Sequence, residues 1–189
     1  MHPDIVLDFW FDRPASQPLQ PRKEWWQKDE SFDADIRIRF GAAVETALAG
    51  GYADWEDAAE SALALLILLD QFPRNIFRGQ ARAFAGDARA RSVAHKAVDR
   101  GFDITVPTVM RQFFYMPFQH SENLAEQDLS ILLFTALEKE LPGHDLLHYA
   151  ERHRAIIAQF DRFPHRNAAL GRTSTPEEIA FLKQPGSSF

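Results

Sequence analysis

The segment AAESALALLILLDQFPRNIFRG (residues 58–79) decides the fold. Residues 62–69 are apolar without a break, so a helix over this stretch is hydrophobic on every side and belongs at the centre of the molecule. Because the residue in front of a proline is biased away from the helical region, Pro73 predicts that this helix ends at about Gln71. The polar residues that follow then form a loop at the end of a buried helix.

Helical periodicity extends from this segment toward both ends of the chain. Apolar residues recur at three- and four-residue spacing between glycine, proline and capping signals, and no segment shows sustained two-residue alternation. The sequence therefore predicts an all-α fold without a sheet, in a single domain over residues 1–189. The expected helices cover residues 3–11, 31–49, 54–71, 87–100, 107–116, 121–140, 144–163 and 175–183, and prolines predict a loop over 13–21.

Composition excludes several classes of protein. The chain contains no cysteine, which rules out disulfides, thiolate metal sites and cysteine nucleophiles. Its net charge of −6 argues against binding along a nucleic-acid backbone. The N-terminal residues lack a basic, signal-like segment, and the longest apolar run is too short for a membrane span. We expect a soluble, cytoplasmic protein that binds neither nucleic acid nor membrane.

A second polar loop repeats the design of the first. The segment FDRFPHRNAALGR (residues 160–172) shares an Asp-x-Phe-Pro motif with residues 70–73, and each copy is followed by arginine, asparagine and glycine. The surplus of arginine in an otherwise acidic chain predicts a pocket for an anion, because guanidinium groups suit carboxylate and phosphate. An alternative is that these side chains donate to the free carbonyls of the helix ends. The candidate ligand-binding residues are Arg74, Asn75, Arg78, His165, Arg166, Asn167 and Arg172.

A third polar segment, RQFFYMPFQHSEN (residues 111–123), adds Arg111, His120 and Glu122 to the candidates. His120 follows a proline at the expected entrance of a helix, where a side chain can face a cleft. A metal set of His120, Glu122 and His165 is conceivable, but no helical metal-binding spacing is present, so we predict neither a metal nor another cofactor. No serine elbow or glycine-rich phosphate loop occurs.

The polar segments overlap with three motifs. The stretches ILLDQFPRNIFRGQARAF, FFYMPFQHSENLAEQ and RFPHRNAALGRTSTPEE occur in this order. Together they resemble the bacterial family called domain of unknown function 924, and the resemblance covers nearly the whole chain. It implies an all-helical fold similar to the right-handed superhelix of tetratricopeptide repeats, built from paired antiparallel helices. It implies no activity.

Three functions remain open from the sequence. The first is a binding module whose arginine, histidine and asparagine side chains hold an anionic small molecule or an acidic peptide end; a homodimer is also compatible with it. The second is a small hydrolase-like or lyase-like enzyme in which His120 or His165 acts as acid or base. The third is a purely structural polar cluster. For the first two, the Asp-x-Phe-Pro loops should lie close together, and His120 and Glu122 should border the same cleft.

Overall fold

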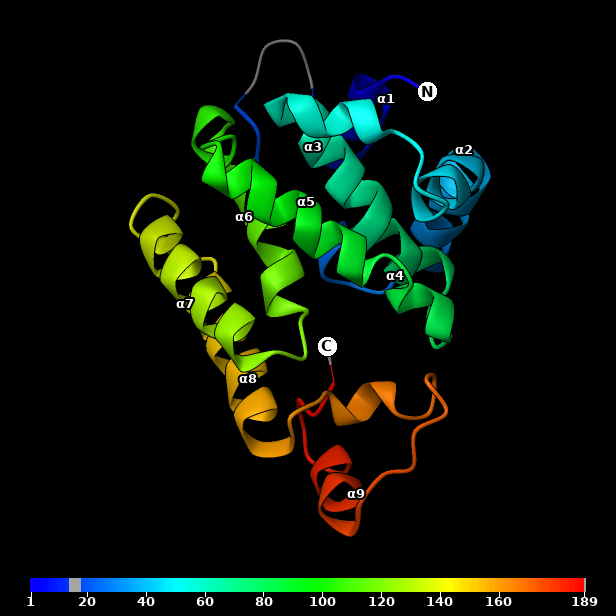
Figure 1. Cartoon of the computed structure of the whole chain (residues 1–189), viewed down its shortest axis with the longest axis vertical. Helices are drawn as coiled ribbons and strands as arrows, with labels where there is room; N and C mark the ends of the chain where they lie inside the picture. Colours follow the sequence, from blue (N-terminus) through cyan, green and yellow to red (C-terminus); the bar gives the residue numbers. More distant parts are fainter. Residues whose placement is uncertain (14–17, 189) are drawn as a thin grey trace.

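The computed structural model describes residues 1–13 and 18–188, and within these ranges it contains helices and turns but no strand (Figure 1). The all-α prediction is therefore confirmed. Residues 14–17 of the expected loop over 13–21 lie outside the described residues. The helices are α1 (Pro3–Phe11), α2 (Glu30–Leu48), α3 (Ala59–Leu66), α4 (Phe72–Ile76), α5 (Asp87–Asp99), α6 (Thr108–Gln119), α7 (Leu124–Glu138), α8 (Leu146–Phe160) and α9 (Pro176–Leu182).

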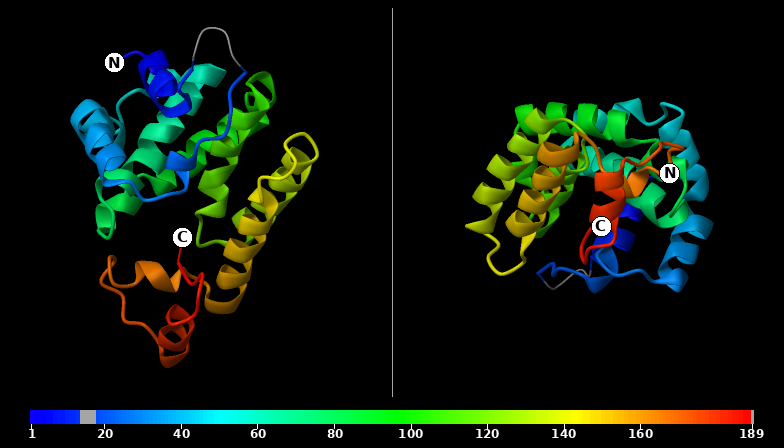
Figure 2. Two further views of the ribbon diagram at one scale, coloured as in Figure 1. Left: turned by 180° about the vertical axis from the view of Figure 1, so that it is seen from behind. Right: turned by 90° about the horizontal axis from the view of Figure 1, so that it is seen from below.

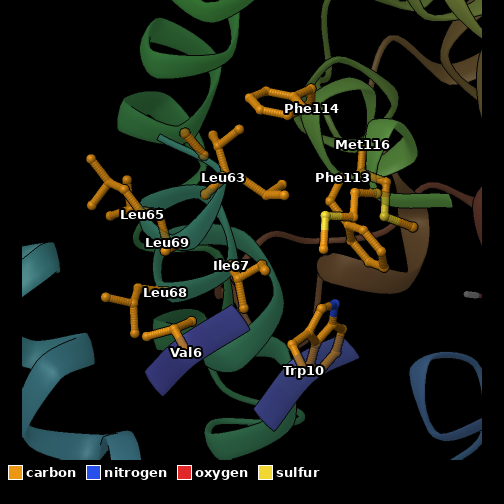
Figure 3. Packing of buried hydrophobic residues seen from close by; sticks show 14 of the residues in the cluster. Val6, Trp10, Leu63, Leu65, Ile67, Leu68, Leu69, Phe113, Phe114 and Met116 are labelled. Carbon is orange, nitrogen blue, oxygen red and sulfur yellow. The ribbon is translucent and has the colours of Figure 1, made fainter. Parts of the chain in front are cut away.

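The central element is the one expected. Residues 62–69 are almost completely buried, and their side chains pack against the aromatic face of α6 and against α1 (Figure 3). In this view Leu63 and Ile67 lie toward Phe113, while Val6 and Trp10 of α1 close the core from below. Apolar side chains all around the helix thus place it inside the main core, and not on its surface.

The prediction that this helix ends before Pro73 is wrong. A π-helical turn, Ile67–Gln71, follows α3, and Phe72 keeps helical dihedral angles (φ −59°, ψ −38°). The N–H of Phe72 donates to the carbonyl oxygen of Ile67, five residues back, which widens the helix by one residue. Pro73 then falls in the first turn of α4, where a missing N–H removes no helical hydrogen bond. The chain therefore continues as a helix to Ile76.

Other helix boundaries differ from the expected ones because tertiary packing or a stronger cap takes over. Helix α6 continues through Pro117 to Gln119, since its last two turns are wholly buried. Helix α7 is capped by Asn123, whose side chain accepts from two backbone N–H groups, and does not begin at Ser121. By contrast, α9 begins as expected after Thr175, whose side chain forms a capping box with Glu178.

Antiparallel pairing is clearest for α7 and α8, which lie side by side along one edge of the molecule (Figure 1). After α8 the chain folds back beneath α4 and α6, and α9 lies there with the end of the chain (Figure 2). This last part has its own small core of Ile156, Ile157 and Phe163. The tetratricopeptide-like superhelical path and the single domain over residues 1–189 stay predictions. In the part of the chain described here, no helix has the length and apolarity needed to cross a membrane.

Candidate functional site

A cavity of about 600 Å³ lies where the chain folds back on itself. Its walls come from the segment before α2, from the π-helical turn and α4, from the ends of α6 and α8, and from the loop after Pro164. Segments far apart in the sequence therefore meet around one space. Of the ten residues predicted as ligand-binding, the cavity is lined by Arg74, Asn75, Arg78, His120, His165 and Arg166.

The inner wall is organised by Asp70, which the π-helical turn carries. This carboxylate is 1% exposed. Its Oδ1 lies 2.8 Å from His120 Nδ1 and 3.1 Å from Arg74 Nη1, and its Oδ2 accepts from Gln71 Nε2 at 2.6 Å. Arg74 also donates to the backbone carbonyl of Asp70 at 2.7 Å. The turn thus holds a buried anion with a histidine and an arginine on the cavity side.

Asp87, at the start of α5, joins the two Asp-x-Phe-Pro loops. Arg74 donates to both of its carboxylate oxygens, at 3.0 and 3.2 Å, and Arg166 Nη1 donates to Oδ2 at 3.1 Å. Arg166 also reaches the backbone carbonyl of His120 at 2.9 Å, and its guanidinium lies between the rings of Phe84 and Phe163. The expectation that the two loops lie close together is confirmed.

Asn75 and Arg78 line the cavity but already have a partner outside its lining. Asn75 Nδ2 donates to Asp33 Oδ1 at 2.7 Å, and Arg78 contacts both oxygens of the same carboxylate at 2.9–3.2 Å. Asp33 is buried on α2. These side chains therefore tie the end of α4 to α2 through a carboxylate, and not through the free carbonyls of a helix end.

Glu122, Asn167 and Arg172 lie outside the cavity, so the expectation that Glu122 borders it is wrong. The two oxygens of Glu122 accept from the Arg172 guanidinium at 2.7 and 2.9 Å, and one also accepts from the Phe163 backbone N–H. Asn167 accepts from Arg172 Nε and donates to Glu178. Since Glu122 is held in this separate cluster, it is not gathered with His120 and His165 as a metal set would require.

Arg111 also lies away from the cavity, where it pairs with Glu140 at 2.8 Å. Arg111 and His120 are nine residues apart, which on α6 means roughly 13 Å along the axis and opposite faces. Sequence proximity to His120 was therefore a misleading signal for this arginine.

Several lining residues were not predicted. Trp26, Tyr149, Arg152 and His153 line the cavity. The last three share one face of α8 by their spacing, so helical periodicity could have placed them together. His153 is buried and its Nδ1 lies 2.8 Å from the Tyr149 carbonyl oxygen, and it also borders the cavity.

Residues 6–186 match the model of a family described as a bacterial protein of unknown function, DUF924. The chain belongs to this family. A solved structure of a protein of unknown function from Agrobacterium tumefaciens is similar, with 41% sequence identity, 96% of each chain covered and a TM-score of 0.83. No curated protein matches the chain. The resemblance inferred from the three motifs is thus confirmed.

Burial and neighbouring arginine charges shift several pKa values on the cavity side of this DUF924 protein. Burial, and then the charge of Arg74, lowers the pKa of Arg166 to about 10. Burial, followed by the charges of Arg166 and Arg74, lowers the pKa of His165 to about 4. The pKa of His120 is lowered by burial and by Arg74, although Asp70 opposes this. Both histidines are therefore neutral at pH 7 beside charged arginines.

The Asp70 carboxylate, unlike the two histidines, is shifted toward its charged form. Burial raises the pKa of Asp70, but the positive charge of Arg74 and the hydrogen bond from His120 outweigh burial and hold that pKa well below its usual range. Asp70 therefore stays ionised at pH 7 and fixes the proton of the neutral His120 ring on Nδ1. The nitrogen that His120 can present to the cavity is Nε2.

These shifts predict that acid weakens the fold before the carboxylates titrate. His165 is neutral in the folded protein, with a pKa of about 4, whereas its unfolded value is 6.5. Its contribution to stability is complete above pH 6.5 and is lost as the pH falls toward 4. We expect roughly 2 kcal/mol of loss over this interval, discounted for the partial exposure of the ring.

Urea denaturation at pH 7, 6, 5 and 4 measures this loss, and His165→Gln should flatten the dependence. The exposed His144 supplies the control, because His144→Gln should leave the dependence unchanged. If the free energy of unfolding changed equally with pH in the wild type and in His165→Gln, the prediction would be wrong. Besides burial, the groups that influence the pKa of His165 are Arg166, Arg74, Glu122 and His120.

Proposed function

We propose that this DUF924 protein binds an anionic small molecule in the cavity between its two Asp-x-Phe-Pro loops. Five cationic side chains line the cavity, and Glu24 is the acidic residue among the described lining residues. A volume of about 600 Å³ falls within the range of small-molecule sites. The cationic lining residues are Lys28, Arg74, Arg78, Arg152 and Arg166.

The observation that carries this proposal is the environment of Arg74 and Arg166. Both guanidinium groups share the carboxylate of Asp87, and Arg166 is 6% exposed between two aromatic rings. Its Nε is a buried donor for which the described residues provide no acceptor. The lowered pKa of Arg166 means that its positive charge is poorly compensated. A carboxylate or phosphate in the cavity would supply the missing negative charge.

The test is stabilisation by anions. Phosphate, sulfate, acetate and citrate are added to the wild type, and thermal unfolding is followed at pH 6 and pH 8. A ligand at a hundred times its Kd stabilises by about 2.7 kcal/mol, which corresponds to a rise in Tm of roughly 5–10 °C. The rise should be larger at pH 6, because a bound anion raises the pKa of His165 and the protonated ring then attracts it.

Arg166→Met should abolish the rise in Tm while the helical circular dichroism remains. Arg111→Met is the matched control: it removes an arginine of α6 that lies outside the cavity, and it should respond to anions like the wild type. If no anion raises the Tm of the wild type, and Arg166→Met is itself strongly destabilised, the cluster is structural and the proposal is wrong.

A second candidate function is hydrolysis, and the Asp70–His120 pair favours it. The carboxylate orients the ring at 2.8 Å, so that Nε2 carries a lone pair toward the cavity. This nitrogen would take a proton from water as the water oxygen attacks an acyl or phosphoryl centre; the ester bond breaks and the leaving oxygen receives the proton. Arg74 and Arg166 would hold the anionic part of the ester.

The test for hydrolysis uses p-nitrophenyl phosphate and an ester with a free carboxylate. His120→Gln should reduce turnover at least 100-fold while anion-induced stabilisation persists, because removing a general base typically costs 10²–10⁴-fold. The pH–rate profile should lose its ascending limb in the variant. Turnover that is absent in the wild type, or unchanged in His120→Gln, would exclude this reaction and leave the binding function.

A further inference from the structure

A second cavity, of about 350 Å³, adjoins the first. Trp26, Leu146 and Tyr149 line both cavities, so these side chains form the partition between them. Two of the three are aromatic and come from different parts of the chain, the segment before α2 and the first turn of α8. Two aromatic rings therefore border both cavities.

Among the phenylalanine, tyrosine and tryptophan side chains of residues 1–13 and 18–188, those of Trp26 and Tyr149 are the exposed ones. Trp25 is 9% exposed, stacks with Trp10 and donates from Nε1 to the Trp10 carbonyl oxygen at 2.9 Å. Its neighbour Trp26 is 50% exposed, and Tyr149 is 46% exposed. Large exposed rings that line a cavity are available for stacking on a ligand, whereas Trp25 is occupied by the core.

Positive charge lines the first cavity together with these rings. The Arg152 guanidinium lies 5.8 Å from the ring centre of Tyr149, and Arg152 also lines the first cavity. In the same cavity, Arg74 and Arg166 share Asp87. The cavity therefore combines exposed aromatic rings with arginine side chains.

We infer that the ligand is an anion that carries a planar ring, with the ring between Trp26 and Tyr149 and the phosphate or carboxylate near Arg74 and Arg166. This inference rests on the proposed anion-binding function and adds the chemical class of the ligand. Inorganic anions fill only a small part of a cavity of about 600 Å³. Aromatic stacking accepts many kinds of planar ring. The class of ligand is therefore defined by a planar ring together with an anionic group.

The experiment compares inorganic phosphate, cyclohexyl phosphate, phenyl phosphate and benzoate by isothermal titration calorimetry. We expect phenyl phosphate to bind the wild type about tenfold more tightly than inorganic phosphate and severalfold more tightly than cyclohexyl phosphate. Trp26→Ala should remove this advantage without changing the affinity for inorganic phosphate, and Trp26→Phe should restore most of it. Tyr149→Leu is a second variant, at the other exposed ring. Benzoate tells whether a carboxylate serves as well as a phosphate.

The outcomes separate the two proposals. If inorganic phosphate binds but phenyl phosphate binds no more tightly, or if Trp26→Ala weakens both ligands equally, the aromatic subsite is refuted and the anion site stands. If no anion binds to the wild type, both fail. Because Trp26 is half exposed, Trp26→Ala should keep the wild-type circular dichroism spectrum, so a lost advantage reports on the ligand and not on folding.

Discussion

Arg74→Met is expected to lower the free energy of unfolding by about 3–5 kcal/mol at pH 7. The substitution keeps an apolar stem of similar length but removes the positive charge that Asp70 and Asp87 share. Asp70 is 1% exposed, and its remaining partners are the neutral His120 and Gln71. A buried carboxylate without a compensating charge is strongly unfavourable, so most of the loss should come from Asp70. Urea denaturation of the two proteins measures it.

The control for Arg74 is an arginine in an exposed ion pair. Arg154 pairs with Asp128 where both side chains are largely in water, and Arg154→Met should cost less than about 1 kcal/mol. The double variant Arg74→Met with Asp70→Asn should recover part of the loss, because the uncompensated charge is gone. A loss below 1 kcal/mol in Arg74→Met would mean that solvent compensates Asp70, against the burial described above.

Gly86→Ala is expected to cost at least about 3 kcal/mol. A Cβ atom built on Gly86 lies 2.1 Å from the carbonyl oxygen and 2.9 Å from the carbonyl carbon of Leu69. Both atoms belong to the backbone of the π-helical turn, so no side chain can rotate away to make room. Pro73, four residues beyond Leu69, has no N–H to donate to that carbonyl, which leaves it open to the close approach of the glycine. The start of α5, with Asp87, would have to move.

Gly41→Ala provides the matched comparison for Gly86. Gly41 lies inside α2, and a Cβ atom there meets nothing within 4 Å. Alanine should therefore stabilise the protein by about 0.5–1 kcal/mol through its higher helix propensity. Thermal and urea unfolding of both variants would show opposite signs. Similar effects at the two positions would contradict the close approach of Gly86 to Leu69. Anion-induced stabilisation of Gly86→Ala then reports whether the position of Asp87 matters for the cavity.

Much of the candidate site follows from motifs in the sequence, but their partners do not. Arg74, His120, His165 and Arg166 were predicted because arginine and histidine cluster after buried helices, and all four border one cavity. Asp87, the carboxylate that Arg74 and Arg166 share, was not among the predicted site residues. It lies 79 residues from Arg166, and no local pattern links residues so far apart.

The fold class could be derived from the chain alone, because helical periodicity and an all-apolar segment are local properties of residues 58–79. The continuation of the helix through Pro73 could not be derived from the sequence, because the π-helical turn depends on the residues that pack around it. The same holds for Trp25 and Trp26, which are adjacent and chemically identical. Trp25 is packed against Trp10, whereas Trp26 is half exposed and lines both cavities together with Tyr149. Burial is set by contacts across the whole chain, and these arise only when distant segments fold against each other.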